Sequence, residues 1–323
     1  MRPIAALMIV ACAGASSSRS PAPTPGRAER LPVESLEAYA LADGYLVVPN
    51  DGKLLGLDHP PSETAELLAA AGLPRDPIRL DIQCLLVKTG DRVILFDTGT
   101  GDVTDADAGH LPQSLALVHV APLELTDIFI SHFHSDHVGG LVTSAGALAF
   151  PNATIHVSAP EWVAARADPD ADSQRLVRAI AAKVSPFEPG AQVLPMVHAV
   201  STPGHTTGHS SYEIGGDGQK LFYLGDVAHH AVISVQRPEW PIQVDADRVA
   251  GATMRKQMLA KLAAEHTHVF VSHFPFPGIG RVGADGQGLV WRPDRAEPLL
   301  TRKPHGLAPS CEIRRVRCDR LPS

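Results

Sequence analysis

Residues 131–140 read SHFHSDHVGG and place three histidines and one aspartate within six positions. Imidazole and carboxylate groups together are the ligands that bind zinc and similar divalent metals. The apolar residues 128–130 precede them and predict a buried strand, so the polar side chains follow on the loop that leaves it. Gly139 and Gly140 allow a tight backbone turn where a helix can start. The chain is therefore expected to fold around a metal site at the end of a strand.

The spacing of these side chains divides them into two pairs. On an extended loop, His132 and His134 point to the same side and can share one metal. Asp136 and His137 come one turn later and can serve a second metal about 3.5–4 Å away. The alternative is a histidine-rich surface loop, but packing does not require such clustering. We predict two divalent metal ions, with zinc as first choice and manganese, iron or cobalt compatible with the same donors.

Composition limits the class of protein and the partners to be expected. The 323 residues are 44% hydrophobic and 20% charged, which is ample for a large globular core. A net charge of -7 gives no reason to expect nucleic acid or an acidic membrane surface as a partner. No run of about 20 apolar residues is present, so no membrane-spanning helix is expected.

The N-terminus has the layout of a secretory signal. Arg2 precedes the apolar residues 4–11, and Cys12 and small residues follow. The residues up to Cys12 also resemble a bacterial lipobox, which would make this cysteine a lipid anchor. Ordinary cleavage beside Ala13 or Ala15 and a retained cytoplasmic N-terminus are the alternatives. We predict an exported protein, periplasmic or lipid-anchored.

The other cysteines do not form a disulfide framework in a chain of this length. Cys84 lies in an apolar run and is expected to be a buried free thiol. Cys311 and Cys318 lie seven residues apart in a basic tail and are expected to pair if the compartment is oxidising.

The rest of the sequence predicts alternating strands and helices. The expected strands cover residues 82–87 and 93–96 as a hairpin, 126–130, 154–157, 193–200, 221–224 and 269–272, with a further hairpin in 46–57 around Asn50-Asp51-Gly52. The expected helices cover residues 62–71 with Ser62 as cap, 111–120, 171–183 and 247–265. In the last helix Met254, Met258 and Leu262 repeat at i+4, and Arg255 falls elsewhere on the wheel.

Five of the expected strands are followed by a histidine or an aspartate. These residues are Asp97, His132, His205, Asp226 and His273. Strands that all deliver polar side chains at one end build a site along one edge of a stack of sheets.

Several motifs resemble the metallo-β-lactamase superfamily. In chain order they are Asp97-Thr98-Gly99, His132-x-His134-x-Asp136-His137, Pro203-Gly204-His205-Thr206-x-Gly208-His209, Gly225-Asp226 and Ser272-His273. They span roughly residues 40–290. The resemblance implies an α/β fold, an αβ/βα sandwich of two mixed β-sheets with helices on the outer faces and metals at one rim.

The resemblance also implies a ligand set. The first metal would be held by His132, His134 and His205, the second by Asp136, His137 and His273, and Asp226 would bridge both. Asp97 and His209 resemble residues that orient ligands, although each can instead be an ordinary turn or core residue.

The bridging Asp226 distinguishes among the branches of the superfamily. True β-lactamases lack it, whereas glyoxalase II, phosphodiesterases and lactonases have it. Residues 224–229, 244–247 and 272–280 further resemble the methyl parathion hydrolase-like and lactonase-like branch. This implies a dinuclear metal-dependent hydrolase, in which a metal-bridging hydroxide attacks an ester, lactone or phosphotriester. The alternatives are a β-lactamase, a glyoxalase II-like thioesterase, or a non-catalytic exported metal-binding protein, and the seven intact ligands argue against the last.

We assign catalytic roles to Asp136 and His229. His229 follows Asp226 by three residues, at the place where similar lactonases carry a tyrosine that helps the leaving group. Its imidazole can donate a hydrogen bond or a proton there, or it can merely line the rim. Candidates for lining the substrate pocket are Phe133, Trp162, Phe274 and Phe276, and plain packing is an equal alternative for Trp162 and Phe276.

The expected organisation has four parts. Residues 1–15 form a signal peptide or lipoprotein leader, 16–30 a flexible tether, 31–293 the hydrolase domain and 294–323 a C-terminal tail. The expected partner is a small-molecule ester, lactone or phosphotriester substrate. Assembly as a homodimer is left open.

Overall fold

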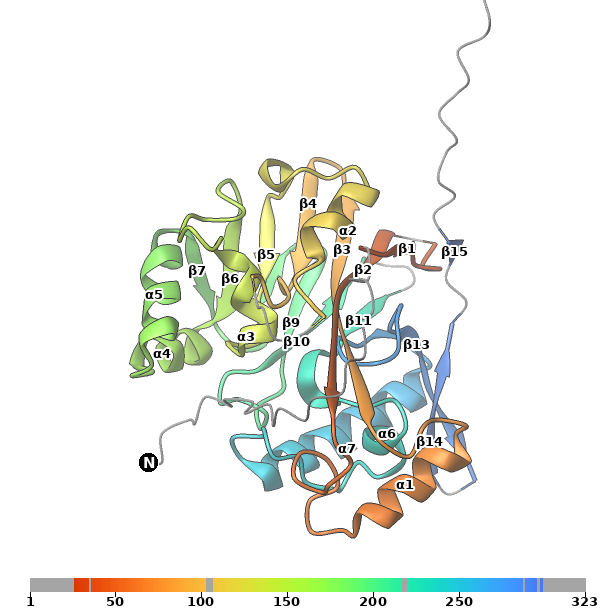
Figure 1. The fold of residues 1–323 in the computed structure, drawn as a ribbon. Helices are drawn as coiled ribbons and strands as arrows, with labels where there is room; N and C mark the ends of the chain where they lie inside the picture. The colour runs from red at the N-terminus through yellow and green to blue at the C-terminus, as the bar shows by residue number, and fades with distance from the viewer. Residues whose placement is uncertain are drawn as a thin grey trace, which may run out of the picture.

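The computed structural model describes residues 26–34, 36–102, 107–216, 220–286, 288–294 and 297–298. Two mixed β-sheets lie face to face, with helices on their outer sides (Figure 1). In the described residues the first sheet has eight strands in the order β15-β1-β2-β3-β4-β5-β6-β7. The second has seven in the order β14-β13-β12-β11-β10-β9-β8. The predicted αβ/βα sandwich of the metallo-β-lactamase fold is confirmed.

The first sheet joins an antiparallel half to a parallel half. Its strands are β1 (Ala28–Arg30), β2 (Glu37–Val48), β3 (Ile78–Thr89), β4 (Arg92–Phe96), β5 (Asp127–Phe129), β6 (Thr154–Ser158), β7 (Val184–Phe187) and β15 (Glu297–Pro298). Pairing is antiparallel from β15 to β4 and parallel from β4 to β7. Parallel strands carry their C-terminal ends to one edge, which is where the motif of residues 131–140 begins.

The second sheet is antiparallel except at its centre. Its strands are β8 (Gln192–Leu194), β9 (Val197–Ser201), β10 (Ser210–Ile214), β11 (Leu221–Tyr223), β12 (His268–Phe270), β13 (Ile279–Asp285) and β14 (Gly288–Pro293). Strands β11 and β12 are parallel, so they too deliver the residues that follow them to a common edge.

Helices cover the outer faces. They are α1 (Pro61–Ala70), α2 (Leu111–Leu117), α3 (Ser135–Val138), α4 (Ala159–Ala167), α5 (Ala171–Ile180), α6 (Ile233–Gln236) and α7 (Arg248–Glu265). Short 3-10 turns are η1 (Pro122–Glu124), η2 (Gly139–Leu141), η3 (Ala181–Lys183) and η4 (Gly225–Val227). Figure 1 shows α4 and α5 beside β6 and β7, and α7 at the other side of the molecule beside β13 and β14. None of the helices in the described part of the chain is long and apolar enough to cross a membrane.

The apolar run in β3 explains why both of its faces are covered. Leu85 and Val87 pack between the two sheets, whereas Cys84 and Leu86 pack on the side of α2. Successive side chains of a strand point to opposite faces, so a run without polar residues requires two apolar surroundings. Cys84 is buried and free, as predicted.

An aromatic cluster fills the space between the sheets below the candidate site. Phe96 contacts Phe129, Tyr212 and Tyr223 with ring centroids 5.3, 5.4 and 5.5 Å apart. All four side chains are fully buried, and burial of each of the two phenylalanines contributes about 1.5–3 kcal/mol of transfer free energy. The Tyr212 hydroxyl donates to the carbonyl of Ile130 and the Tyr223 hydroxyl donates to Asp97, so the packed rings support the candidate site from below.

The hairpin predicted within residues 46–57 is wrong. Strand β2 instead pairs with β3 along its whole length, from Glu37–Lys88 to Val48–Ile78, and α1 lies in the connection between them. Asn50 bonds within that connection: its amide nitrogen donates to the carbonyls of Pro61 and Arg75. The turn residues therefore open a long loop instead of reversing one strand onto another.

Other differences are local. Helix α1 begins at Pro61 without a side-chain cap, so Ser62 is not its cap. The expected strand 193–200 is two strands, β8 and β9, separated by a turn at Pro195, which has no N–H to continue the ladder. The remaining expected elements are found with their ends within about four residues.

The ends of the expected domain also differ from the structure in detail. Residues 28–30, placed in the tether from sequence, form β1, because they pair with β2 and bury Ala28. Beyond residue 293, Glu297 and Pro298 pair with β1 as β15. Cys12, Cys311 and Cys318 lie outside the described residues.

Candidate metal centre

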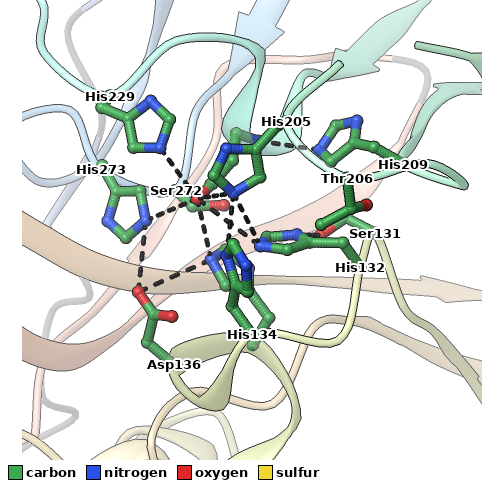
Figure 2. Close-up of polar contacts among 12 residues, drawn as sticks. Ser131, His132, His134, Asp136, His205, Thr206, His209, His229, Ser272 and His273 are labelled. Atoms are coloured by element: carbon green, nitrogen blue, oxygen red, sulfur yellow. Dashed lines mark hydrogen bonds and ion pairs between the residues drawn. The ribbon is translucent and has the colours of Figure 1, made fainter. Parts of the chain in front are cut away.

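The predicted ligands meet at one rim of the sandwich (Figure 2). They come from four places in the fold: the loop after β5 with α3, the loop between β9 and β10, η4 after β11, and the loop after β12. Helix α3 begins at Ser135, earlier than the expected start at Gly139 and Gly140, because His134 already accepts the first helical hydrogen bonds at its carbonyl. Asp136 and His137 therefore lie on a helical turn and not on the loop.

The ligand atoms form two groups. His132, His134, His205 and Asp226 make up one, and Asp136, His137 and His273 make up the other, with all ligand atoms of a group within 4.8 Å of one another. In the first group, His205 Nε2 lies 3.2 Å from His132 Nε2 and 2.9 Å from His134 Nδ1. In Figure 2, Asp136 and His273 lie on one side of the cluster and His132 on the other.

Asp226 belongs to the first group and also faces the second. Its Oδ2 is 3.4 Å from His205 Nε2 in the first group. The same oxygen is 3.2 Å from His273 Nε2 and 3.3 Å from His137 Nε2 in the second. Burial alone would raise the pKa of Asp226, but His137 and His273 hold it well below the usual range. The carboxylate is therefore an anion facing both groups.

The hydrogen bonds around the cluster leave its central atoms free for a cation. Two of the outward-facing ring nitrogens bond to carboxylates: His205 Nδ1 lies 3.0 Å from Asp245 Oδ1, and His137 Nδ1 lies 2.7 Å from Asp97 Oδ2. When Nδ1 carries the proton, Nε2 presents a lone pair to the centre. His137 Nε2 and Asp226 Oδ1 are buried without a hydrogen-bond partner in the described structure. Converging lone pairs in a buried site fit a divalent metal, so the residues present suit this group.

Asp97 supports the second group, as the sequence predicted. Its Oδ2 accepts hydrogen bonds from Ser131 Oγ at 2.6 Å and Tyr223 Oη at 2.6 Å in addition to His137. Its backbone is left-handed, with φ of 57°, a conformation that a non-glycine residue holds only when its surroundings fix it. The carboxylate thus ties β4, β5, β11 and His137 into one unit.

His209 supports Asp226. Burial lowers the pKa of His209 to about 4, so its ring is neutral at physiological pH. Its Nε2 accepts the backbone N–H of Asp226 at 3.0 Å, and its Nδ1 lies 2.8 Å from Thr202 Oγ1. This network positions the backbone of Asp226, as expected of a residue that orients a neighbouring carboxylate.

Asp245 and Arg255 were missed as a pair by the sequence analysis. Arg255 was expected away from the apolar stripe of α7, yet it is 1% exposed. It donates to the carbonyls of Pro238 and Trp240 at 3.0 and 2.9 Å, and its Nη1 lies 3.5 Å from Asp245 Oδ2. Burial raises the pKa of Asp245 and lowers that of Arg255, and the ion pair offsets both effects. The only sequence signal was the resemblance of residues 244–247 to the lactonase-like branch, and it assigned no role to Asp245.

Glu161 and Asp81 were also missed. Glu161, 3% exposed on α4, reaches the loops that carry His132 and His205. Burial raises its pKa above the usual range. The backbone carbonyl of Asp81 accepts from His273 Nδ1 at 2.8 Å. Nothing in the local sequence distinguishes these acidic residues from surface ones.

His229 lies deeper than the sequence suggested. Its Nε2 is 3.3 Å from Asp226 Oδ2, which matches the distance from His137, and the side chain is buried. Its ring stacks on that of His273 at 5.7 Å and 8°. Neither of its ring nitrogens has a hydrogen-bond partner in the described structure. The side chain therefore points into the centre with a nitrogen available.

The four aromatic residues proposed for the pocket lie in three different environments. Phe133 packs against Trp162 with centroids 5.8 Å apart, in the loop that carries the ligands. Phe274 is not a pocket residue, because it is fully buried in the core under Trp291. Phe276 is half-buried beneath the guanidinium of Arg27, 4.3 Å from its ring centre.

The fold and site together define a class of proteins. The family model of the metallo-beta-lactamase superfamily matches residues 77–263, more than half of the chain. The chain belongs to this superfamily. This superfamily consists of metal-dependent hydrolases and includes lactonases, and the His/Asp cluster of the chain is able to bind metal.

Particular relatives make the likeness more specific. AidC, a dizinc quorum-quenching lactonase solved in complex with a product, is 30% identical with a TM-score of 0.77, and the match covers 84% of this chain and 98% of AidC. The hydrolase AbOPH is 26% identical with a TM-score of 0.78, and the match covers 85% of this chain and 99% of AbOPH. An N-acyl homoserine lactonase from Bacillus sp is 29% identical over 43% of this chain, and the match spans 60% of that lactonase. A match to ribonuclease Z from Pyrococcus horikoshii is 30% identical over 23% of this chain and spans 21% of that relative.

Proposed function

We propose that this protein is a dinuclear metal-dependent hydrolase that opens lactones, with aryl esters and phosphotriesters as further substrates. The observation that carries the proposal is the position of Asp226. Its Oδ2 lies within 3.4 Å of nitrogens from both ligand groups, which suits a carboxylate shared by two ions. The dizinc lactonase AidC, similar over 98% of its own length, supports a lactone as the first substrate class.

The residues of the chain have separate tasks in this reaction. Bound metal ions would acidify water at neutral pH and polarise the carbonyl or phosphoryl oxygen. His132, His134 and His205 would hold one position, with His132 and His205 buried and His134 partly buried. Asp136, with a side chain 21% exposed, is the more open ligand of the other position. A substrate can therefore approach from the side of Asp136 and displace water there.

We further propose that His229 donates a hydrogen bond to the leaving oxygen. Its Nε2 faces Asp226, and its ring nitrogens have no other partner in the described structure, so a donor is available at the centre. Donation from a positioned side chain is worth about 10²–10⁴-fold for a poor leaving group. The alkoxide released from a lactone is such a leaving group, and nitrophenolate is not.

A substrate panel on zinc-loaded protein tests the proposal. The panel contains N-acyl homoserine lactones, a simple γ-lactone, a nitrophenyl ester, a paraoxon-type triester and a β-lactam. We expect the highest kcat/KM with a lactone and loss of activity after chelation. Hydrolysis of the β-lactam alone, or equal rates before and after removal of metal, contradicts the proposal.

A further inference from the structure

The three imidazoles of the first ligand group come from two loops in different sheets. The loop 132–134 follows β5 of the first sheet, and the loop 205–208 lies between β9 and β10 of the second. Their ring nitrogens approach to 2.9 and 3.2 Å. In the tautomers that bind a metal, all three of these nitrogens present lone pairs, which repel one another until a cation is bound. Something must therefore hold the two loops together before a metal arrives.

A single buried carboxylate joins these loops. Glu161 Oε1 accepts the backbone N–H of Phe133, the residue between His132 and His134, at 2.9 Å. Glu161 Oε2 accepts Thr206 Oγ1 at 2.7 Å and the N–H of Gly208 at 3.0 Å. Thr206 directly follows His205 and is drawn beside the cluster in Figure 2. Both loops thus bond to the same side chain.

The start of α4 fits closely against the second loop. Ser158 Oγ accepts the N–H of Glu161 at 3.3 Å and donates to the carbonyl of Gly208 at 2.6 Å. A Cβ atom at Gly208 would lie 2.2 Å from the Glu161 nitrogen, so only glycine allows this approach. With Glu161 itself 3% exposed, the bonds are shielded from water and stronger than surface ones.

We propose that Glu161 is a positioning residue that preorganises the His132, His134 and His205 metal position by tying its two loops together. This inference rests on the proposed two-metal function. Glu161 acts on one metal position only, because the residues of the other position are held through Asp97 and the carbonyl of Asp81. Loss of the tie should weaken one bound metal and leave the other unchanged.

Zinc binding to Glu161→Gln tests the proposal. Glutamine has the same shape, but only one of its two terminal atoms is an acceptor oxygen. Its amide nitrogen must face the N–H or O–H donors of one of the two loops and cannot accept a hydrogen bond from them. Chelator-treated protein is titrated with zinc by calorimetry, and release is timed with a chromogenic chelator. We expect one equivalent to bind about 10–100-fold more weakly, as for other groups that orient metal ligands. The second equivalent should keep the wild-type affinity.

Two single-position backgrounds show which metal is affected. In His273→Ala, which keeps only the first group intact, adding Glu161→Gln should weaken the remaining zinc by the same factor. In His134→Ala, which keeps only the second group intact, adding Glu161→Gln should change nothing. A general loss of packing would act equally in both backgrounds.

A matched control separates positioning from stability. Asp127 is also a buried carboxylate with three side-chain partners, Arg92, Thr126 and His156, but it lies at the opposite end of β5 from the ligands. Asp127→Asn should lower the melting temperature without changing either zinc affinity. If Glu161→Gln does not fold, Thr206→Val removes one of the three bonds and should weaken the same equivalent by about 2–10-fold.

The outcomes are distinct. Unchanged affinities in Glu161→Gln, or equal weakening of both equivalents, overturn the positioning role. A wild-type protein that binds no zinc, or saturates at one equivalent, overturns the proposed function instead.

Discussion

His230 links the stability of the fold to pH. The side chain is 5% exposed, and its Nδ1 accepts the backbone N–H groups of Val232 and Ile233 at 3.1 and 3.2 Å, at the start of α6. An acceptor at Nδ1 requires the neutral ring. Burial lowers the pKa of His230 to about 4, which keeps the ring neutral in the folded protein.

The sign of the effect follows from the two protonation states. A histidine in the unfolded chain has a pKa of about 6.5, so the unfolded chain binds the proton first as pH falls. The stability that neutral His230 contributes is therefore present above pH 6.5 and is lost as pH falls through about 4. The gap between the two pKa values corresponds to about 3 kcal/mol in total, of which about 2 kcal/mol is lost between pH 7.5 and 5.

His230→Asn isolates this contribution. The Oδ1 atom of asparagine can accept the same two N–H groups, but the side chain does not titrate. We expect the variant to be about 1 kcal/mol less stable than wild type at pH 7.5, from lost packing. At pH 5 the variant should be about 1 kcal/mol more stable than wild type, because wild type alone loses about 2 kcal/mol.

Urea unfolding of both proteins from pH 5 to 7.5, in the same zinc-containing buffer, measures the difference. Contributions from other groups and from metal release are common to both proteins and cancel. Parallel curves for the two proteins would refute the reasoning, since they would mean that His230 takes up its proton equally in the folded and unfolded states. NMR titration of the His230 ring gives the pKa directly.

Four further predictions follow from the centre and the termini. Elemental analysis should find two metals per chain in wild type and about one in Asp226→Ala; one metal in both proteins contradicts a shared carboxylate. His229→Ala should keep both metals, slow alkyl lactones by about 10²-fold and hardly affect nitrophenyl esters; equal small losses on both would make this histidine a lining residue. Mass spectrometry of the protein from its native host should find a processed N-terminus, lipidated if Cys12 is an anchor; an intact initiator methionine rules out export. In exported protein, Cys311 and Cys318 should be disulfide-bonded, and breaking the bond should cost less than the typical 2–4 kcal/mol; free thiols contradict the pairing.

Much of the candidate site was predictable because its signals are local. A short apolar strand followed by His132 and His134 specifies both the strand and the side to which the ligands point. The same event recurs at His205, Asp226 and His273. Strands that end in polar side chains predicted a site along one edge, and the family resemblance implied how these residues group. The parallel pairs β4–β5 and β11–β12 bring the residues that follow them to that edge.

Asp97 and His209 were indicated by the family resemblance, but the supporting roles of Asp245 and Asp81 were not predictable, because their partners are distant in sequence. His205 is held by Asp245, 40 positions away, and His273 by the carbonyl of Asp81, 192 positions away. Helical periodicity placed Arg255 away from the apolar stripe, because periodicity reports only the spacing of residues along one helix. Its burial is decided by carbonyls that other segments bring to it.

The sequence by itself determined the ligand types and most of the strands, because apolar patterns and ligand spacing act over a few residues. The resemblance of its motifs to the metallo-β-lactamase superfamily implied the sandwich. Only the tertiary structure decided that Glu161 is buried and not on the surface, and that His229 points into the centre. A charged or polar side chain tolerates burial only where donors or acceptors from other segments meet it. Those partners exist only once the two sheets have packed together.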